Sequence, residues 1–235
     1  ERLDPTDGFQ DITVLELGDA SGPRGTRLTV GYRPSAFAFD AQSTRAFGIT
    51  EDGISIVDLT PGGIRLSQLV SLPSARGIQP DVSITADGSR ALARIERSSI
   101  LYDIDLTSGA TREIDLGGPI SDLDLSADGT RAVAVIRAQP SEGSAGDAGV
   151  ASDAGDAGAP VEEPPSTVPS EAVFITIPAG LGDAAERRTL VIPNGGVGSV
   201  SLSPDGSRAV LFSTALGSGQ VTLVGPDLSQ RAVDL

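Results

Sequence analysis

Bulky apolar residues alternate with small or polar ones along four short stretches of the chain, and each stretch lies just before a repeated Arg. The residues eight and six places before that Arg are Phe37 and Phe39, Val82 and Ile84, Leu123 and Leu125, and Val200 and Leu202. A period of two places alternate side chains on opposite faces of an extended chain. Each stretch therefore predicts a β-strand with one bulky face and one slim face.

A turn phrase follows each of these strands. Its copies at 85–91, 126–132 and 203–209 contain Asp-Gly followed two residues later by Arg-Ala. Gly accepts the positive φ that closes a hairpin built on a type I turn. The copy at 40–46 has Ala41-Gln42 in place of Asp-Gly, so we expect its hairpin to be longer or looser. We interpret the Asp, Gly and Arg as turn residues with no part in an active site.

Three further strands complete each repeat. A second strand begins at the repeated Arg, and its Ala (Ala46, Ala91, Ala132 or Ala209) indicates that two sheets approach closely. Third strands are predicted at 54–59, 100–106, 173–177 and 221–224, and fourth strands at 65–69, 111–116, 188–192 and 231–235. The repeated Arg residues are 45, 41 and 77 residues apart. Removing roughly 34 residues from the last interval restores a period typical of four-stranded propeller blades.

The domain organisation follows from this period. Residues 1–235 form a single domain or segment, with predicted blades at 34–70, 79–116, 119–192 and 196–235 and the outer half of an earlier blade at 10–31. We therefore expect an all-β fold, a β-propeller of four-stranded antiparallel blades, with about four and a half blades that belong to a larger propeller. The alternative is a self-contained small ring with an irregular N-terminal hairpin.

The extra residues of the third blade form an acidic insertion at 139–170 that is rich in Gly, Ala, Asp and Pro. Oxygen ligands suit calcium, so a calcium loop is one interpretation. The spacing of its acidic residues matches no EF-hand, however, and Gly, Ala and Pro cannot bury enough apolar surface to order a chain. We expect a disordered insertion and no cofactor, with calcium as the alternative.

Charge and missing residue types limit the possible functions. The chain has 17 basic and 32 acidic residues and a net charge of −15, which disfavours nucleic acid and favours a basic protein surface or a cation as partner. It has no His and no Cys, which removes Ser-His-Asp and Cys-His catalysis and the usual zinc sites. No apolar run approaches the ~20 residues that span a bilayer, so we expect no membrane span.

Three carboxylates are the candidate binding residues. Asp81, Asp122 and Asp124 lie on the slim side of predicted first strands, which begin near the central channel of a propeller. Together they could bind a cation or the basic tip of a partner protein at the channel mouth. The alternative, which we favour, is that they cap strands and solvate the mouth.

The last repeat carries a family resemblance. The run Ser203-Pro-Asp-Gly-Ser-Arg-Ala-Val210, followed by Gln220–Val224, resembles the repeat of bacterial WD40-like propellers of the TolB and YVTN types. This resemblance implies an extracytoplasmic location: periplasm, outer-membrane surface or secreted. Our hypothesis is a non-catalytic module of the bacterial cell envelope that binds or scaffolds proteins. The alternative is a propeller enzyme, such as a lactonase, or the gating domain of a hydrolase.

Overall fold

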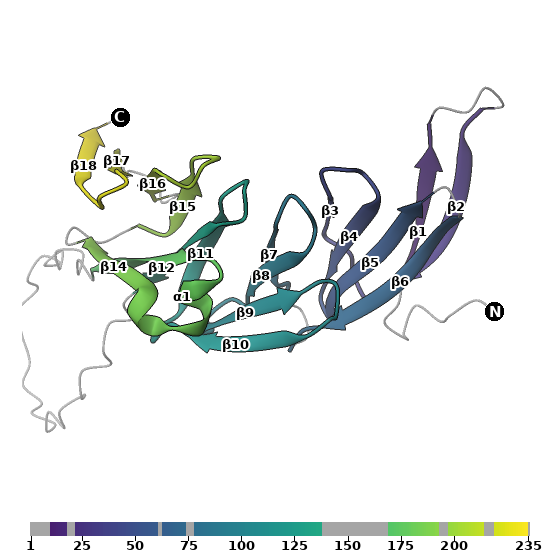
Figure 1. The fold of residues 1–235 in the computed structure, drawn as a ribbon, viewed down its shortest axis with the longest axis horizontal. Coiled ribbons are helices and arrows are strands. Elements are labelled where there is room, and N and C mark those ends of the chain that lie inside the picture. The colour runs from purple at the N-terminus through teal and green to yellow at the C-terminus, as the bar shows by residue number, and fades with distance from the viewer. Residues whose placement is uncertain are drawn as a thin grey trace, which may run out of the picture.

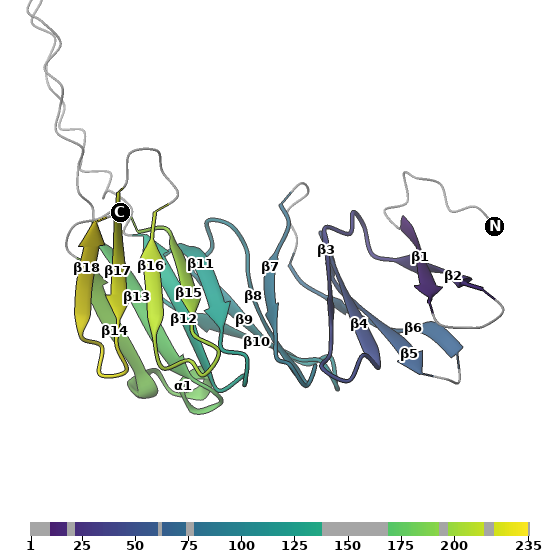
Figure 2. The same cartoon turned by 90° about the horizontal axis from the view of Figure 1, so that it is seen from above.

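The blades follow one another along an open arc. The structure, a computed structural model, describes residues 10–17, 22–60, 63–73, 78–137, 169–192, 197–213 and 219–234. Its strands form four four-stranded sheets and one two-stranded sheet. Figure 1 shows the sheets in chain order from β1 and β2 at one end to β18 at the other, and Figure 2 shows the same succession from above. The predicted all-β propeller of four-stranded antiparallel blades is confirmed.

Each sheet is an antiparallel meander of consecutive strands. The N-terminal hairpin consists of β1 (Gln10–Glu16) and β2 (Arg24–Val30). Blade 1 consists of β3 (Ala36–Phe39), β4 (Arg45–Thr50), β5 (Gly53–Thr60) and β6 (Gly63–Ser71). Blade 2 consists of β7 (Asp81–Ile84), β8 (Arg90–Arg94), β9 (Ile100–Asp105) and β10 (Thr111–Asp115). Blade 3 consists of β11 (Ile120–Leu125), β12 (Arg131–Arg137), β13 (Ser170–Thr176) and β14 (Arg187–Ile192). Blade 4 consists of β15 (Ser199–Leu202), β16 (Ala209–Phe212), β17 (Gln220–Val224) and β18 (Gln230–Asp234).

The repeated phrase forms the turn between the first and second strands of each blade. Gly88, Gly129 and Gly206 have φ of 64°, 70° and 63°, which is the left-handed conformation that this turn requires. In each of these turns the N–H of the Gly donates to the carbonyl oxygen three residues earlier. The predicted turn role of the Asp-Gly pair therefore agrees with the geometry.

The first copy of the phrase corrects one prediction. Its turn is neither longer nor looser than the others, because the Ser43 N–H donates to the Asp40 carbonyl oxygen across the same three residues. Gln42 and Ser43 occupy the places of Asp and Gly, and Ser43 itself takes a φ of 55°. The Asp40 carboxylate accepts hydrogen bonds from the N–H groups of Thr44 and Arg45, which closes the turn without an Asp at its third position.

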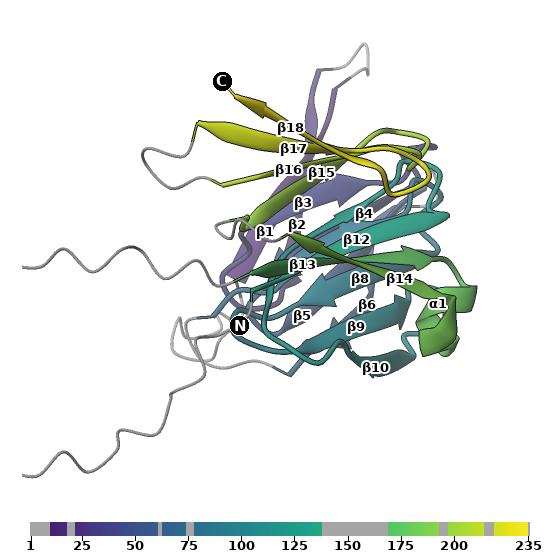
Figure 3. The ribbon, with the colours of Figure 1, turned by 90° about the vertical axis from the view of Figure 1, so that its left-hand side faces the viewer.

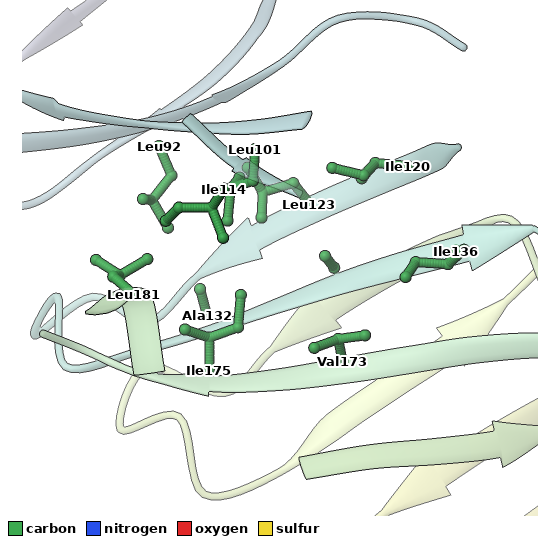
Figure 4. Packing of buried hydrophobic residues seen from close by; sticks show 11 residues of the cluster. Leu92, Leu101, Ile114, Ile120, Leu123, Ala132, Ile136, Val173, Ile175 and Leu181 are labelled. Carbon is green, nitrogen blue, oxygen red and sulfur yellow. The ribbon is translucent and has the colours of Figure 1, made fainter. Parts of the chain in front are cut away.

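The hydrophobic core lies between successive blades. One cluster joins blades 1 and 2, a second joins blades 2 and 3, and a third joins blades 3 and 4. Figure 4 shows the second of these, a cluster that contains Leu92 and Leu101 of blade 2 together with Leu123 of blade 3. The predicted close approach of sheets at the repeated Ala is confirmed, because the exposed fractions of Ala46, Ala91, Ala132 and Ala209 are 5%, 0%, 1% and 2%.

Blade 3 contains a short helix that the strand pattern does not predict. The helix α1 (Ala179–Gly182) and a 3-10 turn at Ala184–Glu186 connect β13 to β14. Leu181 of α1 is buried in the cluster between blades 2 and 3. A four-residue helix is too short to show a helical period in the sequence, so the pattern predicts only a Gly-rich connection here.

The acidic insertion lies almost entirely outside the described residues. The structure describes blade 3 up to residue 137 and again from residue 169, and Ser170 already belongs to β13. The predicted disorder of 139–170 therefore stays a prediction, as do the limits of the domain. Within the described ranges, no helix combines the length and the apolar character needed to cross a membrane.

Candidate functional site

Two of the candidate carboxylates join the first strands of blades 3 and 4. Asp122 Oδ2 accepts a hydrogen bond of 2.8 Å from the Val200 N–H, and Asp124 Oδ2 accepts one of 2.7 Å from the Leu202 N–H. β15, which contains Val200 and Leu202, is the edge strand of its sheet, so these N–H groups face no further strand among those that the structure describes. The Asp122 and Asp124 carboxylates of β11 supply the acceptors that a neighbouring strand would otherwise provide.

Both carboxylate oxygens of Asp124 accept hydrogen bonds from backbone N–H groups of the protein. Its second oxygen, Oδ1, accepts a hydrogen bond of 2.8 Å from the Leu125 N–H. The second oxygen of Asp122 lies 4.0 Å from the Arg94 Nη2 atom, which holds a positive charge beside it. A cation that entered here would have to compete with these donors.

Asp81 belongs to the same line of contacts, one blade earlier. Its carboxylate accepts a hydrogen bond of 3.0 Å from Arg94 Nε on the next strand of blade 2. Arg94 Nη1 also donates to the Ile120 carbonyl oxygen of blade 3, 3.3 Å away. Arg94 thus links blades 2 and 3, and the three predicted candidates follow one another along the first strands β7 and β11. Their binding of a cation or a basic partner stays a prediction.

The metal interpretation finds no ligand cluster within the part of the chain that the structure describes. No three acidic side chains there come together in a way that could hold an ion. The acidic residues of the insertion, which prompted the calcium alternative, lie in residues 138–168 and outside the described ranges.

Two of the four repeated Arg residues reach from one blade to the next, a role that the sequence pattern does not show. Arg45 Nη2 donates to the Asp87 carbonyl oxygen at 3.0 Å, and Arg131 Nη1 donates to the Gly206 carbonyl oxygen at 3.3 Å. Each donor lies in one blade and each acceptor lies in the turn of the next. The periodic recurrence of Arg beside an Asp-Gly turn was the available signal, but sequence spacing alone does not show which blade the side chain reaches.

Hydrogen bonding also determines the charge state of the turn Asp residues. The Thr85 hydroxyl and the Ser89 N–H donate to the Asp87 carboxylate and lower its pKa to about 2. The equivalent Ser203 and Ser207 donors lower the pKa of Asp205 to about 2. These carboxylates are therefore held ionised by the turn itself.

Asp103 and Asp105 lie two residues apart on β9 and have different structural roles. Asp103 has a side-chain exposed fraction of 6% and is paired with Arg90 and Arg112. Asp105 accepts hydrogen bonds from the N–H groups of Thr107 and Ser108 at the following turn, which lowers its pKa. The two carboxylates therefore bind different partners.

Exposed apolar side chains gather at the two ends of the arc. Phe37 and Phe39 on β3 are 43% and 61% exposed, at the end that carries the N-terminal hairpin. Val210 and Leu223 of blade 4 are 36% and 39% exposed at the other end. The sequence pattern places Phe37 and Phe39 on the bulky face of a first strand, and only the order of the blades shows that this face is uncovered.

Comparison with known proteins supports the fold. No protein-family model matches the chain. A stretch of 108 residues, 46% of the chain, is 29% identical to a protein of Oryza sativa subsp. japonica named "Probable protein phosphatase 2C 16", of which it covers 19%.

Three similar solved structures illustrate the likeness. Hydrazine synthase of Kuenenia stuttgartiensis has a TM-score of 0.54 at 15% identity, with 86% of this chain and 49% of that chain covered. The β-propeller domain of Cps50 (Swd1) from Myceliophteria thermophila has a TM-score of 0.51 at 13% identity, with 88% and 62% covered. The WD40 repeats of RRP9 have a TM-score of 0.50 at 14% identity, with 87% and 52% covered.

These likenesses concern the fold. The chain spans about half the length of the hydrazine synthase and RRP9 chains that it matches. Neighbours described as WD40 repeats or β-propeller domains confirm the predicted β-propeller fold. The finer assignment to the TolB and YVTN types stays a prediction.

Proposed function

We propose that this chain is a non-catalytic propeller scaffold that binds another protein. The observation that carries the proposal is that the candidate polar residues are bonded within the protein, whereas large apolar side chains are exposed. Carboxylates that could have formed a polar site, Asp122 and Asp124, accept backbone hydrogen bonds inside the wall. Large apolar side chains are exposed at the ends of the arc instead. Exposed apolar patches on a rigid framework are typical of protein-interaction surfaces.

The fold supports this function by analogy. WD40 propellers stand among the structural neighbours, and such a framework can present loops and blade faces to partners without chemistry of its own. Fold alone does not determine function, so the surface argument carries the proposal and the neighbours only favour it.

The partner surface is basic. The net charge of −15 repels anionic surfaces and attracts cationic ones, and this attraction weakens as salt screens it. Association should therefore slow as the ionic strength rises, mainly through a lower association rate.

We further propose an extracytoplasmic location in a bacterial cell envelope. The support is the resemblance of the last repeat to TolB and YVTN propellers. Fractionation of the cells that produce the protein tests this: recovery in the envelope or the medium is expected, and recovery in the cytoplasm would overturn it.

The experiment for the function is affinity capture after chemical crosslinking, with the crosslinked residues mapped by mass spectrometry. We expect a stoichiometric protein partner whose crosslinks fall on this chain. Asp81→Asn/Asp122→Asn/Asp124→Asn is the matched variant, because it neutralises the channel-mouth carboxylates while the exposed apolar residues stay intact. Capture of the partner by this variant is the expected result.

Catalysis is the outcome that would overturn the proposal. Lactone substrates are incubated with the purified chain, with and without calcium, and hydrolysis is followed by pH-stat titration. Calcium-dependent turnover that the triple Asn variant abolishes would establish an enzyme and replace the scaffold.

A further inference from the structure

A small pocket lies in the joint between blades 3 and 4. Its volume is ≈ 130 Å³, and its walls include Arg131, Phe174 and Arg188 of blade 3 together with Leu202 and Leu228 of blade 4. The β15–β16 and β17–β18 turns of blade 4 supply further wall residues. Figures 2 and 3 show these two turns on the same side of the molecule as α1. The pocket therefore combines two guanidinium groups with apolar side chains.

Blade 2 is an internal reference for the strand positions that form this pocket. Asp103 on the third strand of blade 2 pairs with Arg112 on the fourth strand. Phe174 on the third strand of blade 3 pairs in the same way with Arg188. In both blades the repeated Arg stands two residues before the second-strand partner of this third-strand residue. The three equivalent places are occupied by Arg90, Asp103 and Arg112 in blade 2 and by Arg131, Phe174 and Arg188 in blade 3.

In blade 2, the two Arg residues bind one carboxylate between them. Arg90 Nη1 donates to Asp103 Oδ1, and Arg112 Nη2 donates to Asp103 Oδ2 at 2.7 Å. The Asp103 side chain is only 6% exposed, and these two charge-assisted bonds compensate for its burial. Each guanidinium group thus binds one oxygen of the same carboxylate.

Blade 3 keeps both Arg residues but has Phe174 at the place of the carboxylate. Arg131 Nη1 donates to the Gly206 carbonyl oxygen, and Arg188 Nη2 donates to the Asp227 carbonyl oxygen, each at 3.3 Å. A guanidinium group has five N–H donors, so these long bonds leave donors for a ligand. Within the described ranges, neither Arg131 nor Arg188 forms an ion pair with a carboxylate.

The acidic residues of the neighbouring turns are bonded elsewhere. Asp128, Asp205 and Asp227 each accept a hydrogen bond from the hydroxyl group of the Ser or Thr two residues further along their own turn. These carboxylates therefore stabilise their own turns and do not pair with the two guanidinium groups of the pocket.

The chemistry of the pocket favours a small organic acid. Its two guanidinium groups attract an anion, and each can donate a charge-assisted hydrogen bond to one carboxylate oxygen. The apolar side chains of Phe174, Leu202 and Leu228 favour an aliphatic chain on that anion. Because a cavity of about 150 Å³ holds a benzene molecule, ≈ 130 Å³ accommodates a carboxylate with a chain of roughly three carbons. The net charge of −15 disfavours ligands of higher negative charge, such as phosphate.

We propose that this pocket binds the carboxylate of a small aliphatic acid, with one oxygen at each guanidinium group, as Asp103 is bound in blade 2. The aliphatic chain of the ligand lies against Phe174 and Leu202. This site adds small-molecule binding to the proposed scaffold function and does not depend on it. Since its walls come from two blades, a bound acid also joins blade 3 to blade 4.

The test is a titration of the protein with butanoate, followed by NMR through the Nε–Hε signals of its Arg side chains. The ionic strength is held constant, because salt screens the attraction. We expect saturable one-to-one binding that shifts two signals, those that are lost in Arg131→Gln and in Arg188→Gln. Butan-1-ol carries the same chain without the charge and should bind at least tenfold more weakly.

Matched variants locate the binding. Arg188→Gln should weaken butanoate binding at least tenfold, whereas Arg208→Gln, which changes an exposed repeated Arg outside the pocket walls, should leave it within twofold. Phe174→Asp supplies the carboxylate that blade 2 has at this place and should weaken butanoate binding at least tenfold. Phe174→Leu keeps an apolar wall and should leave the affinity within threefold. Circular dichroism melts ensure that only folded variants are compared.

Four results would overturn the inference. They are no saturable binding of butanoate, binding that Arg188→Gln leaves unchanged, binding of butan-1-ol as tight as that of butanoate, and displacement of butanoate by a lower concentration of inorganic phosphate. The proposed scaffold function fails separately, because the capture of a crosslinked partner is measured without butanoate.

Discussion

The Asp124 carboxylate accepts a hydrogen bond of 2.7 Å from the Leu202 N–H, 78 residues further along the chain. The bond runs from the first strand of blade 3 to the first strand of blade 4. Asp122 makes the same contact with Val200 two residues earlier, so a pair of side chains replaces the backbone of a missing neighbouring strand. Blade 1 has Ala36 and Ala38 at the equivalent places, which have no side-chain acceptor.

Removal of this acceptor should destabilise the fold. Asp124→Ala leaves the N–H groups of Leu125 and Leu202 without their partner, and each unsatisfied buried group costs about 1–3 kcal/mol. We expect the free energy of unfolding, measured by urea denaturation, to fall by about 2 kcal/mol. Asp124→Asn keeps one acceptor oxygen and should lose less. Equal stability of wild type and Asp124→Ala would contradict the role assigned to the bond.

Equivalent valines in blades 3 and 4 should respond differently to the same truncation. Val133 is 1% exposed beneath the first strand of blade 4, whereas Val210 is 36% exposed at the end of the arc. Val133→Ala removes buried methyl groups and leaves a cavity, which should cost about 2 kcal/mol by urea denaturation.

Val210→Ala is the control for that truncation, because it makes the same chemical change on an uncovered face. It should cost well under 1 kcal/mol, as surface substitutions usually do. Similar losses for the two variants would show that blade 4 is covered in solution.

Acid should weaken the fold through the turn carboxylates. The folded-state pKa of Asp87 is about 2, below its ordinary value of 3.8, because Thr85 and Ser89 donate to the ionised form. A lowered folded-state pKa stabilises the native state above pH 3.8, and this contribution is lost as the pH falls towards 2. The free energy of unfolding should therefore decline over that window.

The Asp87→Asn variant tests the assignment. It keeps an acceptor oxygen but cannot titrate, so its unfolding free energy should decline less between pH 5 and pH 2 than that of the wild type. Glu96→Gln, a change at an exposed carboxylate in the β8–β9 turn, is the control and should follow the wild type. If the unfolding free energy of Asp87→Asn declined with pH as much as that of the wild type, the Asp87 carboxylate would not be a source of the acid sensitivity.

The first turn should improve when its missing Gly is supplied. Ser43 adopts a φ of 55°, a left-handed conformation that costs a non-Gly residue roughly 1 kcal/mol. Ser43→Gly should therefore raise the melting temperature, measured by calorimetry.

Gly88→Ser is the reciprocal change. At a φ of 64°, an added Cβ would lie 2.8 Å from the Phe47 ring, so both strain and overlap lower stability. A destabilised Ser43→Gly or a neutral Gly88→Ser would contradict the role of the third turn position.

Most of the fold could be predicted because its period is local. Alternating residues such as Val82 and Ile84, followed by a Gly that needs a positive φ, determine a strand and its hairpin within ten residues. The turn of the first copy could not be predicted correctly from this pattern. Asp40 closes its turn from a position that the pattern assigns to Thr or Ser, and side-chain hydrogen bonding is not visible in a period.

The candidate site was predictable only in part. The sequence places Asp81, Asp122 and Asp124 on the slim faces of first strands, and the structure brings them to the joints between blades. The partners of Asp122 and Asp124, the Val200 and Leu202 N–H groups, are backbone groups of a distant strand, and no residue type marks them. The exposure of Phe37 could not be predicted, because the sequence shows bulky residues in every repeat and does not show which of them remain uncovered.

One measurement tests most directly whether these carboxylates join blades while partners bind elsewhere. Asp81, Asp122 and Asp124 are replaced together by Asn, and both the free energy of unfolding and the calorimetric affinities for calcium and for the captured partner are determined. We predict a lower free energy of unfolding with unchanged affinities. Unchanged stability with a tenfold or greater loss of either affinity would establish a binding site at the channel mouth and contradict the scaffold described above.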